Sequence, residues 1–154
     1  MRLLTAMTLF FLAITVPVKA ADADIYLVSF TADWCPNCRV LDPKMEEALG
    51  RFSDGQIEHI VLDMTDAETR EQSFLKVDGT VFAGVYGDHL GVTGIGILTA
   101  PDSGEKIACV TREQSTEEIV EIFRVAREIV LTEPALQRQT GLGMCPVAND
   151  KVAL

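Results

Sequence analysis

Residues 30–38 read Phe-Thr-Ala-Asp-Trp-Cys-Pro-Asn-Cys, and our expectations about the fold begin with them. The two cysteines, Cys35 and Cys38, follow directly on the apolar, β-rich run of residues 25–30. Such a run is typical of a strand that is buried on both faces, in the middle of a sheet flanked by helices. The proline after the first cysteine suits the first position of a helix. The sequence therefore predicts a Cys-x-x-Cys pair at the junction of a buried strand and a helix.

The predicted helix covers residues 36–49, which places Cys35 at its N-cap. The free N–H groups and the dipole at this end of a helix favour a negative charge, so they should stabilise the Cys35 thiolate. Cys38 would lie almost one turn further in and more deeply buried. An exposed attacking sulfur above a buried resolving sulfur is the arrangement that dithiol–disulfide exchange needs. Asp33 adds negative charge nearby and opposes this effect, so the sequence leaves the direction of the Cys35 pKa open.

The rest of the chain alternates between strand and helix patterns. Further strands are predicted at residues 56–63, 95–99 and 106–111, and further helices at residues 66–76 and from Ser115 onward. Ser115 and Glu118 have the spacing of a capping box. Residues 77–91 are glycine-rich and are predicted to form a long loop with at most one short hairpin. The order of elements predicts an α/β fold, with a mixed central sheet covered by helices on both faces.

Length and charge limit the function classes. The 154 residues, 48% of them hydrophobic, suffice for one core and are too few for two ordinary domains. The net charge of −10 argues against general nucleic-acid binding, which needs a basic surface.

The two ends of the chain differ from its middle. Residues 1–20 have the three parts of a secretory signal peptide: a positive start, an apolar stretch and small residues before a cleavage site after Ala20. The apolar stretch is shorter than the ~20 residues that a membrane-spanning helix needs, so an uncleaved anchor is the weaker reading. Residues 132–154 show little periodicity and are expected to form a poorly ordered tail. The domain would then comprise residues 21–131.

The motif around the cysteines resembles that of a known family. Residues 32–38 resemble the active-site motif of the thioredoxin superfamily. Residues 30–39 are most similar to the C-terminal thioredoxin-like domain of the disulfide reductase DsbD and its secreted relatives. Pro43 matches the proline inside the family's active-site helix, and residues 92–96 resemble the segment that carries its cis-proline. The resemblance covers roughly residues 24–130.

The resemblance implies a thioredoxin-like mixed sheet and a role for each residue of the motif. Cys35 and Cys38 would be the catalytic pair, with Trp34, Pro36 and Asn37 in support. Trp34 would shield the pair and offer apolar contact, and Pro36 would set the start of the helix.

The sequence departs from the family at three places. Gly96 stands at the expected cis-proline position among the active-site residues; since an X–Gly cis bond is costly, we expect a trans or flexible peptide there. Ser29 replaces the family's buried aspartate, so Cys38 must lose its proton to water or to another group. By comparison with the family, residues 77–91 are an insertion that should lie near the active site.

The remaining cysteines, Cys109 and Cys145, allow three interpretations. An even number of cysteines in an exported chain suggests a second disulfide between them. Two free thiols, or a Cys145 that passes electrons to the active pair, are the alternatives.

Two histidines complete the candidate groups. His59 falls within a predicted strand and is expected to be a satisfied sheet residue. His89 lies in the predicted insertion, where a solvated position is expected. The alternative is a soft Cu(I) or Zn site formed by Cys35, Cys38 and His89.

The function that we predict is extracytoplasmic thiol–disulfide exchange, for example in a periplasm. Protein thiols and disulfides would be the substrates, a membrane thiol carrier would donate electrons in the reducing direction, and no organic cofactor would be needed. The alternatives are a metal- or partner-binding module without redox turnover and a maturation factor for one client protein.

Overall fold

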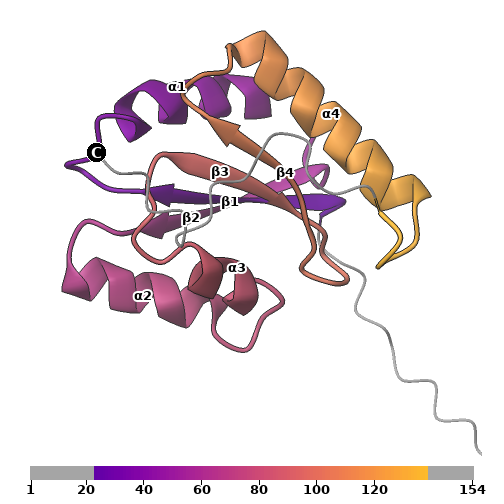
Figure 1. Cartoon of the computed structure of the whole chain (residues 1–154). Helices are drawn as coiled ribbons and strands as arrows, with labels where there is room; N and C mark the ends of the chain where they lie inside the picture. Colours follow the sequence, from indigo (N-terminus) through magenta and orange to yellow (C-terminus); the bar gives the residue numbers. More distant parts are fainter. Residues whose placement is uncertain (1–22, 139–154) are drawn as a thin grey trace, which may run out of the picture.

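Strand β1 (Ile25–Thr31) lies inside the sheet, as its continuous apolar sequence predicts. The computed structural model describes residues 23–138 and orders the strands β2-β1-β3-β4 (Figure 1). β1 pairs in parallel with β2 (Ile57–Asp63) and antiparallel with β3 (Ile95–Thr99). β3 in turn pairs antiparallel with β4 (Lys106–Thr111). The predicted mixed sheet is confirmed.

Helices cover both faces of this sheet (Figure 1). α1 (Cys38–Leu49) and α4 (Thr116–Thr132) lie on one face. α2 (Ala67–Val77) and α3 (Ala83–Asp88) lie on the other. Because side chains alternate along a strand, each face of the sheet contributes its own apolar layer to the core.

The core has two layers, and the cysteine pair belongs to only one of them. The layer beneath α1 and α4 includes Ile25, Leu27, Leu41, Met45, Leu98, Val110, Ile119 and Phe123. The layer toward α2 and α3 includes Val28, Phe30, Leu62, Val77, Val85, Ile97 and both Cys35 and Cys38. The cysteine pair is therefore part of the packed interior at one end of the sheet.

Capping residues mark the N-terminal ends of α2 and α4. Ser115 and Glu118 form the predicted capping box at the start of α4. Asp66 caps α2 and forms a second capping box with Thr69. The capping hydrogen bonds satisfy backbone donors that the first turn of a helix otherwise leaves unpaired.

Two predictions about secondary structure are wrong. α1 begins at Cys38 and not at residue 36, since Pro36 and Asn37 form a turn that precedes the helix. Residues 77–91 are not an irregular loop, because α2 extends to Val77 and residues 83–88 form α3. Val85 and Tyr86 of α3 are buried, so burial of apolar side chains outweighs the low helix propensity of the glycines around them.

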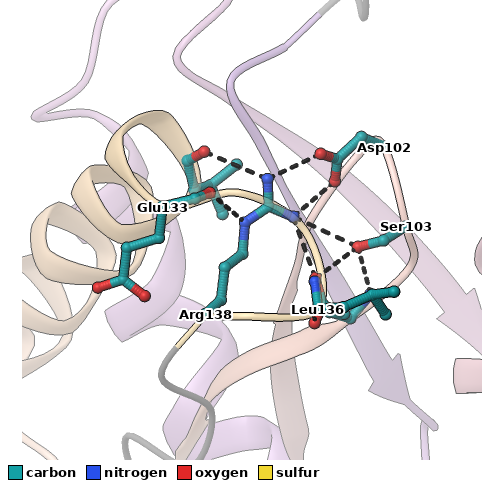
Figure 2. A network of polar contacts seen from close by, with 7 residues as sticks. Asp102, Ser103, Glu133, Leu136 and Arg138 are labelled. Atoms are coloured by element: carbon teal, nitrogen blue, oxygen red, sulfur yellow. Dashed lines mark hydrogen bonds and ion pairs between the residues drawn. The ribbon is translucent and has the colours of Figure 1, made fainter.

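The segment after α4 is anchored by one arginine. Arg138 makes a bidentate ion pair with Asp102, in the turn between β3 and β4, with N–O distances of 2.6 and 2.7 Å (Figure 2). A Glu105 carboxylate oxygen lies 3.2 Å from the same guanidinium, which is 4% exposed. The hydrogen bonds from Arg138 hold the pKa of Asp102 below its ordinary value. The expectation of a poorly ordered tail is thus wrong for residues 133–138, and the rest of that tail lies outside the described residues.

Replacing this arginine with methionine tests how much the anchor stabilises the fold. Arg138→Met keeps an apolar stem but removes the charged hydrogen bonds, which should lower the free energy of unfolding by about 1–2 kcal/mol. Since Asp102 has a lowered pKa in the folded protein, the loss is full at neutral pH and shrinks as acid protonates the carboxylate. Urea unfolding at several pH values measures both effects.

Arg124→Met is the matched control for this variant. Arg124 forms ion pairs with Glu121 and Glu128 on the outside of α4, and its side chain is 56% exposed. Exposed pairs contribute little, so the control should unfold like the unchanged protein. Equal losses in the two variants would contradict the anchoring role of Arg138.

No helix within residues 23–138 is both long enough and apolar enough to cross a membrane. The predicted signal peptide, residues 1–20, lies outside the part of the chain that the structure describes.

Candidate active site

A disulfide links Cys35, in the segment between β1 and α1, to Cys38, the first residue of α1. The two Cα atoms are 5.3 Å apart, and each residue is only 2% exposed. The structure thus shows the oxidised form of the pair. Cys35 sits in the turn after β1, where its N–H donates to the Ala32 carbonyl at 3.0 Å, and Cys38 is the first residue of α1.

The sulfur of Cys35 receives a hydrogen bond from the start of the helix. The N–H of Cys38 donates to Cys35 Sγ at 3.1 Å. We predicted Cys35 itself as the N-cap, but the cap is Asn37, whose backbone is helical and whose side chain makes no capping hydrogen bond. The N-cap prediction was wrong by two residues, yet a first-turn amide does point at the sulfur. This donor favours the thiolate form of Cys35 once the disulfide is reduced.

We expected Cys35 to be more exposed than Cys38, but both residues are only 2% exposed. Gly94 lies against Cys35 and shields it from solvent. The N–H of Gly94 donates to the Phe30 carbonyl at 2.8 Å, which holds the segment before β3 against the end of β1. A Cβ atom at this glycine would lie 3.4 Å from Cys35 Sγ and 2.5 Å from Cβ of Asn37. Its φ of +75° is also in the left-handed region that favours glycine. Both features explain why a residue without a side chain occupies this position.

Gly96, which we predicted among the active-site residues, lies elsewhere. It pairs with Ser29 inside β3, and a Cβ there would meet Met45, Val110 and Leu27 in the core beneath α1. Residues 23–138 contain no cis peptide bond, in agreement with the trans peptide expected at Gly96. Because Ile95 already belongs to the strand, the chain reaches the cysteines two residues earlier, at Gly94.

The other residues of the motif, Trp34, Pro36 and Asn37, differ in how far they are exposed. Trp34 is 58% exposed, and its indole N–H donates to the Thr65 carbonyl at 2.9 Å, which ties it to the segment after β2. Pro36 is exposed in the turn before α1, and Asn37 is half-buried against Gly94. Trp34 and Pro36 therefore present apolar surface to solvent beside a covered disulfide.

A group of polar side chains lies on the face of the sheet that α1 covers. Thr31 Oγ1 donates to Asp42 Oδ2 of α1 at 2.8 Å. Ser29 Oγ and His59 Nε2 are 2.8 Å apart, which joins β1 to β2. Burial raises the pKa of Asp42, against the opposing effects of the Thr31 hydrogen bond and of His59. Burial lowers the pKa of His59, against the opposing charges of Asp42 and Glu46.

The sequence identified only part of this polar group. It placed Ser29 in the position of a buried acid and predicted that His59 is satisfied within the sheet, which its contact with Ser29 confirms. It did not predict the neighbourhood of Asp42. The parallel register of β1 and β2 brings these residues together, and a helical spacing of four residues puts Asp42 one turn beyond Cys38.

His89 is buried, contrary to the solvated position that we expected. Its Nδ1 lies 2.8 Å from the Val85 carbonyl, and its ring packs against Phe30 with centroids 5.7 Å apart. Within residues 23–138, no three His, Cys, Asp or Glu side chains form a group that could hold a metal ion. The structure therefore does not assemble the alternative metal site of Cys35, Cys38 and His89.

Cys109 lies at the middle of β4, opposite Ile97, and is buried. None of the cysteines within the described part of the chain is free. Cys145 lies outside that part, so its pairing with Cys109 stays a prediction.

Comparisons with known proteins found similarities to this chain. A family model described as Thioredoxin matches residues 16–81. A thioredoxin-related protein from Neisseria meningitidis serogroup B has a TM-score of 0.51 at 17% sequence identity, covering 72% of this chain and 90% of that one. A thiol:disulfide interchange protein of the thioredoxin family from Chlorobium tepidum TLS has a TM-score of 0.48 at 19% identity, covering 70% and 82%. Comparison with curated proteins found no match.

The likeness to the Neisseria protein shows the fold, and the family model spans β1, the cysteine motif and β2. The motif itself is intact, with its two cysteines close enough to form a disulfide. The chain therefore has a thioredoxin-like fold and carries a Cys-x-x-Cys pair at Cys35 and Cys38, and these features support a thiol–disulfide oxidoreductase.

Proposed function

We propose that this protein reduces disulfides of protein substrates outside the cytoplasm, with Cys35 as the attacking and Cys38 as the resolving cysteine. The observation that carries the proposal is the hydrogen bond from the Cys38 N–H to Cys35 Sγ. It selects Cys35 as the sulfur whose thiolate the helix stabilises, and a thiolate is the nucleophile in disulfide exchange.

The proposed reaction has two steps and needs no organic cofactor. The Cys35 thiolate attacks a substrate disulfide, forms a mixed disulfide and displaces one substrate thiolate. Cys38 then attacks Cys35 Sγ, releases the second substrate thiolate and leaves the Cys35–Cys38 disulfide seen in the structure. A thiol carrier in the membrane would return two electrons to the pair for the next cycle.

The surface around the pair supports a protein substrate. Trp34 presents an exposed aromatic face beside Cys35, and Pro36 is exposed in the same turn. Large aromatic side chains are favoured at protein interfaces because they bury much apolar area at low entropic cost.

Two features support the location and the direction. The leader-like residues 1–20 support export, and exported thiols meet an oxidising environment in which a reductase needs a dedicated donor. The direction follows from the resemblance of residues 30–39 to the C-terminal thioredoxin-like domain of DsbD-type disulfide reductases.

Redox titration of the pair tests the proposal. We would produce the full chain with its leader in a bacterial host, equilibrate the purified protein in thiol buffers and count alkylated cysteines by mass. We expect the Cys35–Cys38 couple to titrate at about −200 mV or below, and a couple near about −120 mV would make the protein an oxidant instead. The same mass should show that the chain begins at Ala21. A pair that does not titrate would contradict redox turnover and favour a binding module.

A further inference from the structure

Cys109 takes part in a disulfide that the exchange reaction does not use. It lies in β4, opposite Ile97, outside the Cys-x-x-Cys pair. Its thiol is not free, because Cys109 is disulfide-bonded. Cys35 and Cys38 are bonded to each other, and the sequence has four cysteines. Cys145 is therefore the one partner that remains for Cys109 within this chain.

The side chain of Cys109 lies on the face of the sheet that α4 does not cover. It belongs to the core layer toward α2 and α3, together with Phe30 and Ile97. The elements that pack most closely on β4 are its neighbour β3 and α4, which lies on the opposite face (Figure 1). α3 reaches the start of β4 through the ion pair of Asp88 with Lys106. A partner of Cys109 must therefore approach from the side of α3.

The segment after α4 starts from the other side of the sheet. Arg138, six residues after the end of α4, binds Asp102 in the turn between β3 and β4 (Figure 2). The same guanidinium lies 3.2 Å from Glu105, four residues before Cys109. At about 3.3 Å per residue, Cys109 is about 13 Å further along the strand. The seven residues from Arg138 to Cys145 span up to about 24 Å when extended, which is enough to reach it.

We propose that Cys109 and Cys145 form a structural disulfide that carries residues 139–145, the strap, past β4 to the α3 side of the sheet. β4 is the last strand in the order β2-β1-β3-β4, so no strand within residues 23–138 pairs with its outer edge. Such an edge is a place where strands of other chains can add. The strap covers this edge. The proposal goes beyond the exchange reaction and does not depend on it.

Formation of this disulfide needs an oxidant that is itself a disulfide, and proteins outside the cytoplasm meet such oxidants. The thiols of Cys109 and Cys145 lose two protons and two electrons as the S–S bond forms. The oxidant takes them up and leaves as two thiols. Because the fold holds the two sulfurs together, the free energy by which the disulfide stabilises the fold also opposes its reduction. A thiol buffer that reduces Cys35–Cys38 completely should leave Cys109–Cys145 intact.

Peptide mapping without a reductant tests the pairing. We would produce the full chain with its leader in a bacterial host, block free thiols with N-ethylmaleimide and digest the purified protein with trypsin. Trypsin separates the candidates, because Cys109 falls in peptide 107–112, Cys145 in peptide 139–151 and the active pair in the peptide that ends at Arg39. We expect peptides 107–112 and 139–151 to be linked in a monomeric protein. Free alkylated peptides, a link to the peptide that ends at Arg39, or a disulfide-linked dimer would each overturn the strap.

Cys145→Ser measures what the strap does for the fold. It should raise the equilibrium constant of unfolding about thirtyfold to a thousandfold, as expected for the loss of a disulfide that closes a long loop. Thr140→Ser is the matched control, because it changes the strap but keeps both cysteines, and it should unfold like the unchanged protein. Amide hydrogen exchange in β4 should be faster in Cys145→Ser than in this control. Equal stability of the two variants would overturn the structural role, and equal exchange would overturn the placement over β4.

Insulin reduction separates the strap from the exchange reaction. Cys145→Ser keeps Cys35 and Cys38, so it should turn over insulin like the unchanged protein at a temperature where both are folded. Loss of turnover would mean that Cys145 passes electrons to the active pair, which would overturn a purely structural disulfide. If the unchanged protein does not reduce insulin, the proposed function fails, while the peptide map still decides the strap.

Discussion

Cys38→Ser is expected to accumulate mixed disulfides with substrate proteins, whereas Cys35→Ser is expected to abolish exchange. The first variant keeps the attacking thiolate and the backbone N–H of residue 38 that donates to it, but lacks the sulfur that releases the substrate. The second lacks the nucleophile, and a serine hydroxyl does not replace a thiolate. Loss of a nucleophile lowers turnover by roughly three orders of magnitude or more.

Non-reducing electrophoresis and mass spectrometry of cell extracts measure the trapped complexes. The double variant Cys35→Ser, Cys38→Ser is the control and should trap nothing. Insulin reduction by a small-molecule thiol measures turnover. Equal trapping by the two single variants would contradict the assignment of Cys35 as the attacking sulfur, and full activity of Cys35→Ser would contradict exchange through this pair.

Gly94→Ala is expected to disturb the active site more than any other glycine substitution outside the core. Its Cβ would lie 2.5 Å from Cβ of Asn37, so the segment before β3 must move away from Cys35. The left-handed backbone costs about 1–2 kcal/mol for a residue with a side chain, and overpacking adds about 1–3 kcal/mol. Displacement of groups around the reacting sulfur should lower kcat/KM for insulin reduction by about tenfold to a hundredfold.

Gly79→Ala separates backbone strain from the close approach to Cys35. Gly79 has a similar φ of +70°, and a Cβ there meets nothing within 4 Å. Thermal unfolding of Gly79→Ala should report the backbone cost alone, with kcat/KM unchanged. The same loss of activity in the two variants would contradict a specific role of Gly94 at the pair.

The elements of the fold that sequence predicts well depend on local interactions. β3 and β4 lie at the predicted residues 95–99 and 106–111, because a tight turn separates two apolar runs. The capping box at Ser115 marks the start of α4, since both partners lie within one turn. The Cys-x-x-Cys pair also lies at the predicted junction of strand and helix. In each case the residues that interact are close together in the chain.

The errors occur where residues far apart in the chain meet. α3 was missed because its glycines favour a loop and only burial of Val85 and Tyr86 against the sheet stabilises the helix. His89, at the end of α3, is buried because the helix packs against the sheet. Arg138 orders the segment after α4 through Asp102, which lies in a distant turn. None of these contacts has a local sequence pattern.

The amino-acid sequence by itself determined the fold class, the position of the cysteine pair and the chemistry that two such cysteines support. These follow from short-range patterns: alternation of apolar residues, capping, and the spacing of two sulfurs at a helix start. Only the tertiary structure decided that Gly94 and not Gly96 lies against Cys35, and that Ser29 contacts His59. The physical reason is that the register between strands and the packing of α1 bring together Gly94 with Cys35 and Ser29 with His59, which are 59 and 30 residues apart in the chain, too far for any local sequence pattern.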